Sequence, residues 1–350
     1  MKISIAFSAL SMLLLTACQS SQLETVNAMQ STQHISQGVY RIEFAAAQHF
    51  AQQAEQLVLG FEQYCRSPNT GLDGVKNQWQ QTTLAWMALQ GQERGPAKAL
   101  EQSWNVQFWP DKKDTTGRKM NVLVHSDILW TEHDIASQSV TVQGIGAIEW
   151  LLYDEYSPLL NATNSSENIH QVCEAAQAIS QNLATKAQFI ATQWNVNPWT
   201  ALDAMAWEAE YIALLSNQLD YSMKKLSRPL ANIGQPRPYF AESWRAKVSM
   251  NNLKANVEAM QRLYLADGGL DFLLRDKGLN DLADRVQNHF ALMLLTWPTE
   301  PSLFDLLQNK EGYRKVLSQD NKFEQLNYLL HDEVAVELGI TIGFNATDGD

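Results

Sequence analysis

Apolar residues recur three and four positions apart along most of the chain, which is the spacing of amphipathic helices. Strand signals are scarce, and only residues 139–142 suggest a short strand. We therefore predict an all-α fold of two packed helical bundles, one at residues 38–197 and one at residues 198–345. The predicted helices are 39–64, 75–90, 144–153, 168–194, 199–226, 240–266, 279–295 and 312–338.

Two segments interrupt the helical pattern. Residues 104–118 contain the turn-forming run Trp-Pro-Asp-Lys-Lys-Asp-Thr-Thr-Gly and are expected to form a loop. Residues 227–238 hold three prolines and a glycine, so we expect a long connection, a kind of segment that is often functional. Pro198 is expected to open the next helix, because proline suits the first helical turn.

The first residues have the pattern of a lipoprotein signal peptide. Lys2 precedes an apolar run at residues 3–15, which has signal-peptide length and is too short to span a bilayer. The sequence Leu-Thr-Ala-Cys then ends at Cys18. We expect residues 1–17 to be removed and Cys18 to carry lipid. An ordinary signal peptide with a chance cysteine is the alternative.

Acylation of Cys18 would anchor the mature chain to a membrane. Gln19 rather than aspartate follows Cys18, which favours a periplasmic protein on the inner leaflet of the outer membrane. Residues 18–37 are rich in Gln, Ser and Thr, so they are expected to form a flexible tether. No other apolar run is long enough to predict a second membrane segment.

The amino-acid composition limits which kinds of molecule the protein is expected to bind. Hydrophobic residues make up 45% of the chain, which is enough for a sizeable core. The net charge of -12 disfavours nucleic acids and anionic lipid surfaces as partners. Cys65 and Cys173 remain after Cys18, and in an oxidising compartment they are expected to form a disulfide. Two separate buried thiols are the alternative.

A polar stripe follows the proline-rich segment. Its members are three and four residues apart, which places them on one face of the predicted helix at 240–266. The stripe is either a solvated face or the lining of a cleft. Serine and asparagine are poor helix formers, which favours the cleft. The members are Glu242, Arg245, Ser249, Asn252 and Asn256.

A single acid interrupts the apolar run at residues 145–152. Glu149 would need a partner if it is buried, and its alternative is a position facing solvent. Gly144 and Gly146 allow a close approach of another backbone. In the loop at residues 104–118, Trp109 and Asp111 either belong to the same site or only cover the core and cap a turn.

Common catalytic motifs are absent from the sequence. It has no HExxH pair, no CxxC pair, no Gly-x-Ser-x-Gly elbow and no phosphate-binding glycine loop. His125 and His133 are weak metal-ligand candidates beside Glu149. His170 and Glu174 lie one helical turn apart, but a surface pair is the simpler interpretation.

Three segments together resemble the imelysin-like family, in particular its branch of predicted periplasmic lipoproteins. They are the run Phe-Trp-Pro-Asp at residues 108–111, residues 144–154, and residues 227–256. The resemblance implies two helical bundles with a site between them and a link to bacterial iron uptake. The family hallmark is a GxHxxE motif, in which Gly144 and Glu149 match but Gly146 replaces the histidine. The resemblance therefore supports the location of a site at these residues more strongly than it supports a bound metal.

From these observations we expect a non-catalytic accessory protein of iron uptake that binds a ligand or a metal. Its cleft would be formed by Glu149 and the polar stripe, with Arg245 neutralising Glu149 through a bidentate pair. Iron or another divalent metal is the candidate cofactor, and envelope proteins of iron uptake are candidate partners. One alternative is a metallopeptidase of the imelysin type, which typically needs three protein ligands and a base. The other is an envelope scaffold that binds a partner protein.

Overall fold

The computed structural model describes residues 33–68, 71–160 and 166–340. The predicted signal peptide, Cys18 and most of the predicted tether lie outside these residues. The described residues form helices and turns without a strand, which confirms the all-α prediction. The described residues from Ser36 to Ile340 belong to one compact unit.

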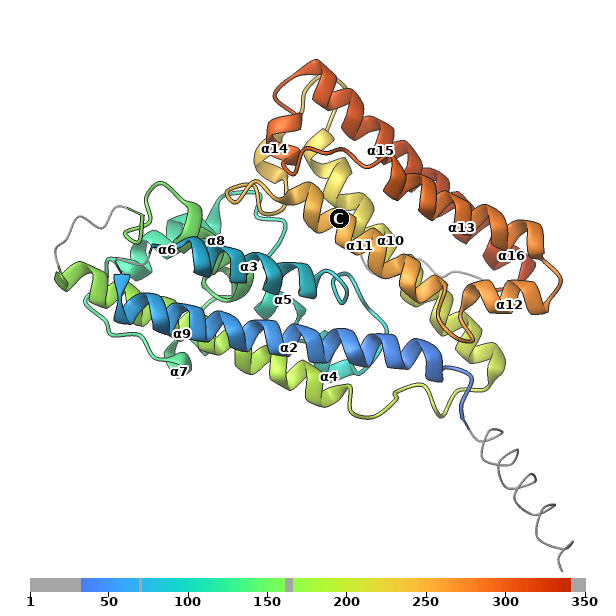
Figure 1. Cartoon of the computed structure of the whole chain (residues 1–350), viewed down its shortest axis with the longest axis horizontal. Helices are drawn as coiled ribbons and strands as arrows, with labels where there is room; N and C mark the ends of the chain where they lie inside the picture. The colour runs from blue at the N-terminus through green and yellow to red at the C-terminus, as the bar shows by residue number, and fades with distance from the viewer. Residues whose placement is uncertain (1–32, 69–70, 161–165, 341–350) are drawn as a thin grey trace, which may run out of the picture. The chain divides into compact units, whose positions relative to one another are not determined.

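Long helices of the N-terminal half form a first group. α2 packs lengthwise against α9 on one side and α3 on the other, and α8 packs against α9 (Figure 1). Alanines recur on the buried face of α2, and their small side chains allow the neighbouring helices to approach closely. These four helices are α2 (Gln37–Arg66), α3 (Asp73–Trp86), α8 (Gly144–Tyr153) and α9 (Ser166–Gln193). The other helices of this group are α4 (Ala97–Leu100), α5 (Ser103–Val106), α6 (Thr115–Val124), α7 (Glu132–Ala136) and the 3-10 helix Val140–Val142.

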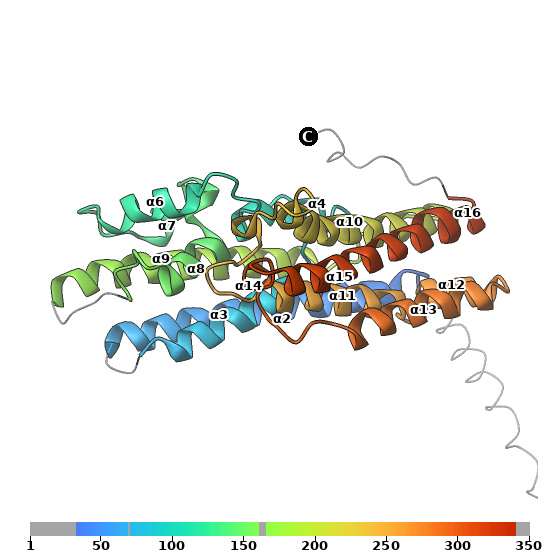
Figure 2. The ribbon, with the colours of Figure 1, turned by 90° about the horizontal axis from the view of Figure 1, so that it is seen from above.

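The C-terminal half forms a second group. α10 packs against α11 and α15, α13 packs against both α11 and α15, and α11 also contacts α2 and α3 (Figure 2). The long helices are α10 (Ala204–Leu230), α11 (Ser249–Tyr264), α13 (Asn280–Leu295) and α15 (Lys310–Tyr328). The others are the 3-10 helix Pro238–Phe240, α12 (Leu270–Asp276), α14 (Leu303–Leu306), the π-helix Leu329–Val334 and α16 (Ala335–Glu337).

A row of four packed aromatic side chains stabilises the connection between α9 and α10. Consecutive ring centroids of Trp194, Trp199, Trp207 and Tyr211 lie 5.5, 5.0 and 5.2 Å apart, and all four side chains are buried. Such pairs add to the hydrophobic gain of burial. The predicted domain boundary at residues 197 and 198 falls in this connection, and the division into two domains stays a prediction.

Several predicted boundaries were wrong for local reasons. The expected loop at residues 104–118 contains α5 and the start of α6, which Asp114 caps by accepting from the Gly117 amide. The expected strand at residues 139–142 is a 3-10 helix. Pro198 does not open α10, because Asp203 caps that helix at the Ala206 amide, and α10 continues through Pro229 to Leu230.

The helix predicted at residues 240–266 begins only at Ser249. Residues 241–248 form a series of turns, in which Ser243 and Lys247 have φ values of 48° and 58°. Left-handed residues cannot continue a right-handed helix. Glu242 and Arg245 therefore precede α11 instead of sharing its face.

The predicted disulfide between Cys65 and Cys173 is confirmed. It joins the last turn of α2 to α9, with a Cα–Cα distance of 5.7 Å. Packing along α2 and α9 is the main contact of the first group, so the disulfide fastens two helices that already lie side by side.

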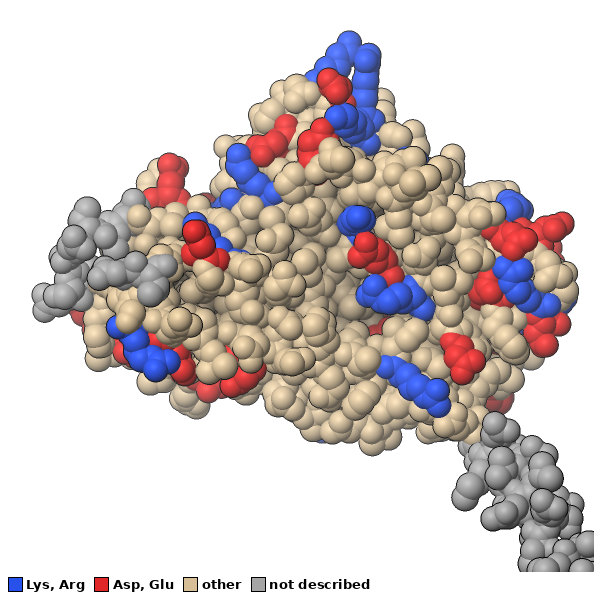
Figure 3. Space-filling view, viewed as in Figure 1, with Lys and Arg blue, Asp and Glu red and all other residues tan. Residues whose placement is uncertain are grey.

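The surface carries both signs of charge. On the face seen in Figure 3, acidic and basic side chains alternate in small groups, and a wide uncharged area lies over the middle of α2 and α3. The sequence accounts for this area, since residues 44–54 and 77–92 contain no charged residue. Among the described helices, none combines the length and the apolar character that a membrane crossing requires.

Candidate functional site

A cavity of about 310 Å³ lies between the loop after α5, the helix α8 and the turns before α11. We call it the Glu149 cavity. It collects segments that are distant in sequence, because α8 packs against α6 and α5 while the turns before α11 approach from the second group. The predicted site residues that line it are Trp109, Asp111, Gly146, Glu149, Glu242 and Arg245.

Glu149 is buried on α8, so the alternative of a solvent-facing acid was wrong. Its Oε1 atom accepts a hydrogen bond from the backbone amide of Ala246 at 3.0 Å. Burial raises the pKa of Glu149 to about 7, against the opposing effect of the Arg245 charge and of the amides at residues 245 and 246. An acid with this pKa can either donate or accept a hydrogen bond near neutral pH.

Arg245 lies beside Glu149 but does not form the predicted bidentate pair with it. Its Nε atom is 2.5 Å from Asp154 Oδ2, and its guanidinium also contacts Asp114 Oδ1 at 2.6 Å. The guanidinium lies over the Trp244 ring, 4.3 Å from the centroid. Asp154 and Asp114 accept from the Nε and Nη2 atoms of Arg245, so the guanidinium acts on Glu149 through its charge, while the Arg245 backbone amide also lowers the pKa of Glu149.

The stripe residues on α11 do not reach the Glu149 cavity and are not solvated either. Ser249, Asn252 and Asn256 are all buried. Asn252 Nδ2 lies 3.2 Å from both Glu242 Oε2 and Ser243 Oγ. Asn256 donates to the Met87 carbonyl at 2.7 Å. The two asparagines therefore belong to a buried polar network behind the cavity, which explains their position within a helix.

An ion pair lies at the centre of this network, and the sequence did not reveal it. Lys225 Nζ is 2.6 Å from Glu242 Oε2, and both side chains are at most 2% exposed. Glu242 Oε1 accepts from Gln90 and Gln107 at 2.5 and 2.9 Å. Burial lowers the pKa of Lys225, and the Glu242 carboxylate opposes that shift. In the sequence, Lys225 looks like its neighbour Lys224 on an amphipathic helix.

Three other predicted site residues have structural roles or lie elsewhere. Gly144 has φ of +66°, and a Cβ atom there would lie 2.1 Å from the Val106 carbonyl oxygen, so glycine lets α8 begin against α5. His125 and His133 are exposed on the first group and do not line the Glu149 cavity. The weak metal candidates are therefore not assembled with Glu149.

The side chains that line the Glu149 cavity provide too few ligand atoms to hold a metal ion by themselves. Gly146 lines the Glu149 cavity but has no side-chain ligand atom, and Glu149 Oε1 already accepts from Ala246. In the part of the chain that the structure describes, no group of three or more His, Cys, Asp or Glu side chains is placed to hold a metal. Structural and catalytic zinc sites typically use three or four protein ligands.

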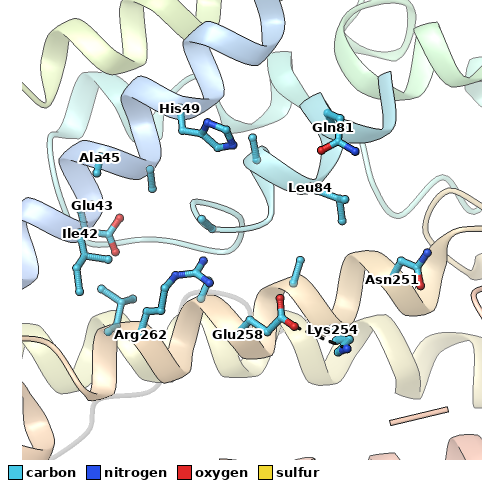
Figure 4. A pocket seen from close by; sticks show the side chains of 16 residues that line it. Ile42, Glu43, Ala45, His49, Gln81, Leu84, Asn251, Lys254, Glu258 and Arg262 are labelled. Atoms are coloured by element: carbon cyan, nitrogen blue, oxygen red, sulfur yellow. Dashed lines mark ion pairs between the residues drawn. The ribbon is translucent and has the colours of Figure 1, made fainter. Parts of the chain in front are cut away.

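A second hollow, about 600 Å³ in volume, lies between α2, α3 and α11. Figure 4 shows Glu43 and His49 on the α2 wall and Arg262 on the facing α11 wall. Glu43 is buried, and one of its oxygens accepts from Gln92 while Oε1 has no partner among the described residues. Burial raises the pKa of Glu43 to about 8. This acid was missed because it follows Ile42 in an ordinary amphipathic pattern.

Glu43→Gln is expected to change the pH dependence of stability. The pKa of Glu43 is about 8 in the folded chain and near 4.5 without burial, so its favourable protonated form is fully present below about pH 4.5. Stability is then lost as the pH rises towards 8. The variant should equal the native chain at pH 4.5 and exceed it by a few kcal/mol at pH 9.

Urea unfolding at the two pH values measures this difference. Glu258→Gln, on the partly exposed α11 wall of the same hollow, is the matched control and should leave the profile unchanged. Parallel profiles for Glu43→Gln and the native chain would contradict the assignment.

Comparisons with known proteins agree with this architecture. A solved imelysin-like protein from Psychrobacter arcticum 273-4 has 19% identity, and the match covers 95% of this chain and 100% of that one with a TM-score of 0.74. A "putative iron-regulated protein A precursor" from Parabacteroides distasonis ATCC 8503 has 13% identity, covers 88% and 94% of the two chains, and has a TM-score of 0.54. These two similarities concern the fold.

No curated protein matches the chain. The family model for Imelysin, also called peptidase M75, matches residues 35–330. Since this match spans most of the chain, the protein belongs to the imelysin family.

Proposed function

We propose that this protein is a non-catalytic, lipid-anchored binding protein of the bacterial envelope, and that its Glu149 cavity takes an anionic organic chelate of iron. The observation that carries the proposal is the composition of that cavity. The buried Glu149, the paired Arg245 and several aromatic rings line one cavity. The described residues provide no group of side chains there that could hold a metal ion by themselves.

Two features of the lining support such a ligand. Trp109, Tyr239 and Trp244 offer aromatic surface, and pockets of a few hundred Å³ lined mainly by such groups are typical for small molecules. Lys112 and Lys113 are exposed at its edge and would attract the carboxylates of an anionic chelate. Glu149 would hydrogen-bond a polar group of the ligand.

The iron connection rests on similarity. One structural neighbour is named as iron-regulated, and the motifs that resemble the imelysin-like family imply a link to iron uptake. In a chelate the organic molecule already supplies the ligand atoms of the iron. A histidine in place of Gly146 is therefore not needed for binding. Lipid on Cys18 would keep the protein at the membrane, and palmitate labelling of the native chain and Cys18→Ala tests this part.

Calorimetric titration tests the ligand. We expect ferric citrate to bind the native chain, whereas ferrous, zinc and copper ions alone do not. Lys113→Glu should weaken ferric citrate binding about tenfold or more, which corresponds to about 1.4 kcal/mol. The matched control is Lys119→Glu, an exposed lysine on α6 that does not line the cavity.

Three results would contradict the proposal. Binding of a bare ion that is lost in Glu149→Gln would indicate a metal site of the protein itself. No binding of ferric citrate or haem would remove the iron chelate as the ligand. Cleavage of casein that disappears in Glu149→Gln would show catalysis.

A further inference from the structure

Four large apolar side chains are exposed on segments that lie near the start of α2. Val196 and Met205 are 73% and 79% exposed, and Leu265 and Phe272 are 43% and 56% exposed. They belong to the connection between α9 and α10, the first turn of α10, the residue directly after α11 and the first turn of α12. We call these four side chains the entry surface, because the chain enters its compact unit just before α2.

Contacts at the start of α2 bring these segments together. Asn197 Nδ2 donates to Ser36 Oγ at 2.9 Å, which places the α9–α10 connection beside the start of α2. A Cβ atom at Gly38 would lie 1.8 Å from the Asp267 carbonyl oxygen, so the turn after α11 also packs there. Figure 1 shows α12 and the first turns of α10 near the blue start of α2. Single exposed apolar residues are ordinary, but several on adjoining segments indicate a contact surface.

The α9–α10 part of the entry surface is uncharged and firmly held. Residues 187–202 contain no charged residue. The row of packed aromatic side chains described above fixes this connection in place. Ala204 and Ala206, the neighbours of Met205 in the sequence, are exposed as well. The apolar exposure is therefore a property of the folded structure and does not arise from a loose loop.

The charges of these segments are paired cations and surplus acids. Residues 195–210 and 265–277 contain two basic residues, Arg275 and Lys277. Arg275 contacts Asp271 at 3.0 Å and Asp284 at 2.7 Å, and Lys277 contacts Glu208 at 2.9 Å. The other acids of the two segments are Asp203, Glu210, Asp267 and Asp276. An anionic surface would therefore be repelled here, whereas an uncharged or zwitterionic one would not.

The chain before α2 limits what can cover the entry surface. Ser36 follows Cys18 by 18 residues. A chain of this length spans at most about 60 Å when fully extended and averages about 25 Å as the flexible tether expected from its composition. With lipid on Cys18, the entry surface stays within that distance of a bilayer. Tethering of this kind raises the local concentration to the millimolar range, so a weak apolar contact suffices.

We propose that the entry surface rests on the bilayer, with its four apolar side chains in the interfacial region of zwitterionic phospholipids. The proposal depends on the lipid anchor proposed above and adds a second contact with the membrane. Apolar side chains at the interface contribute through buried area, and an acyl anchor combined with a second contact holds a protein more firmly than one alone.

This contact would orient the Glu149 cavity away from the membrane. Arg245, which lines the cavity, precedes α11, whereas Leu265 follows its last residue. The 16 residues of α11 separate these two ends by about 24 Å. A body resting on its entry surface therefore keeps the cavity open to the aqueous space in which a chelate diffuses.

Photocrosslinking from the bilayer tests the proposal. The native chain, purified with its lipid, is placed in phosphatidylcholine vesicles that contain a diazirine-labelled phosphatidylcholine, and the adducts are mapped by mass spectrometry. We expect at least fivefold more adducts in residues 195–206 and 265–277 than in residues 121–131. Replacing half of the lipid by phosphatidylglycerol should lower the adducts, because the surplus acids are repelled.

Met205→Glu combined with Phe272→Glu should reduce these adducts at least fivefold. Both positions lie in the first turn of a helix, where an acid is favourable, so the thermal midpoint should stay unchanged. Leu129→Glu is the matched control and should leave the adducts as they are. Leu129 is 64% exposed, and its loop contacts α9 near the disulfide at the other end of α2.

Four results would overturn the proposal. Palmitate on Cys18 without adducts in the two segments would refute the second contact and leave the anchor intact. Absence of palmitate from Cys18 would remove the anchor and this contact with it. Full adduct yield in the double variant, or a higher yield with phosphatidylglycerol, would show that the four apolar side chains do not make the contact. Ferric citrate binding to the Glu149 cavity is measured independently of all four results.

Discussion

Lys225→Met is expected to lower the free energy of unfolding by about 3–5 kcal/mol. The change leaves Glu242 in a position that is 1% exposed, without the cation that lies 2.6 Å away in the native chain. Removing one member of a buried ion pair is strongly unfavourable, because the other charge stays buried without compensation. Lys225 also donates to Gln90 and Asn256, so two further acceptors lose a donor.

Urea unfolding of the variant measures this loss. The double variant Lys225→Met and Glu242→Gln should recover most of the stability, since an uncharged pair in the same place no longer carries an isolated charge. Lys224→Met, on the same helix but only half-buried, is the matched control and should cost about 0–1 kcal/mol. A double variant as unstable as the single one would contradict the explanation.

Removal of the disulfide is expected to have a comparable effect. Cys65 and Cys173 are 108 residues apart, and a cross-link over a loop of about 100 residues stabilises a protein by about 4–5 kcal/mol in the chain-entropy account. Replacing both cysteines by alanine should therefore lower the free energy of unfolding by about 4 kcal/mol. Calorimetry or urea unfolding under oxidising conditions measures the change.

Dithiothreitol provides the internal check on this assignment. It should destabilise the native chain to the level of the double alanine variant and leave that variant unchanged. Cys18→Ala should respond to the reductant as the native chain does. A native chain that is equally stable with and without dithiothreitol would show that the packing of α2 on α9 suffices without the cross-link.

Helical periodicity predicted most of the fold, because a helix with one buried face has apolar residues three and four positions apart. The segment at residues 144–153 was predicted with its observed ends, because it is a continuous apolar run that a glycine opens. The start of α11 was missed because Ser243 and Lys247 adopt left-handed backbone conformations that neither residue type signals. Such a turn is imposed by tertiary contacts rather than by local propensity.

The sequence predicted that the segments around Glu149 and Arg245 meet, but it did not predict the contacts of Arg245. The segments around Glu149 and Arg245 do meet, yet Arg245 contacts Asp154 and Asp114, which lie 91 and 131 residues away in the sequence. No spacing rule relates residues at that separation. Lys225 was missed for a similar reason, because its burial and its ion pair with Glu242 depend on segments that are distant in the sequence.

Gln107 and Trp109 line the Glu149 cavity and also a neighbouring cavity of about 370 Å³, so one wall separates the two spaces. A ligand that moved either side chain would reshape both spaces at once. The affinities on the two sides would then depend on each other, and linkage requires the factor to be identical in both directions.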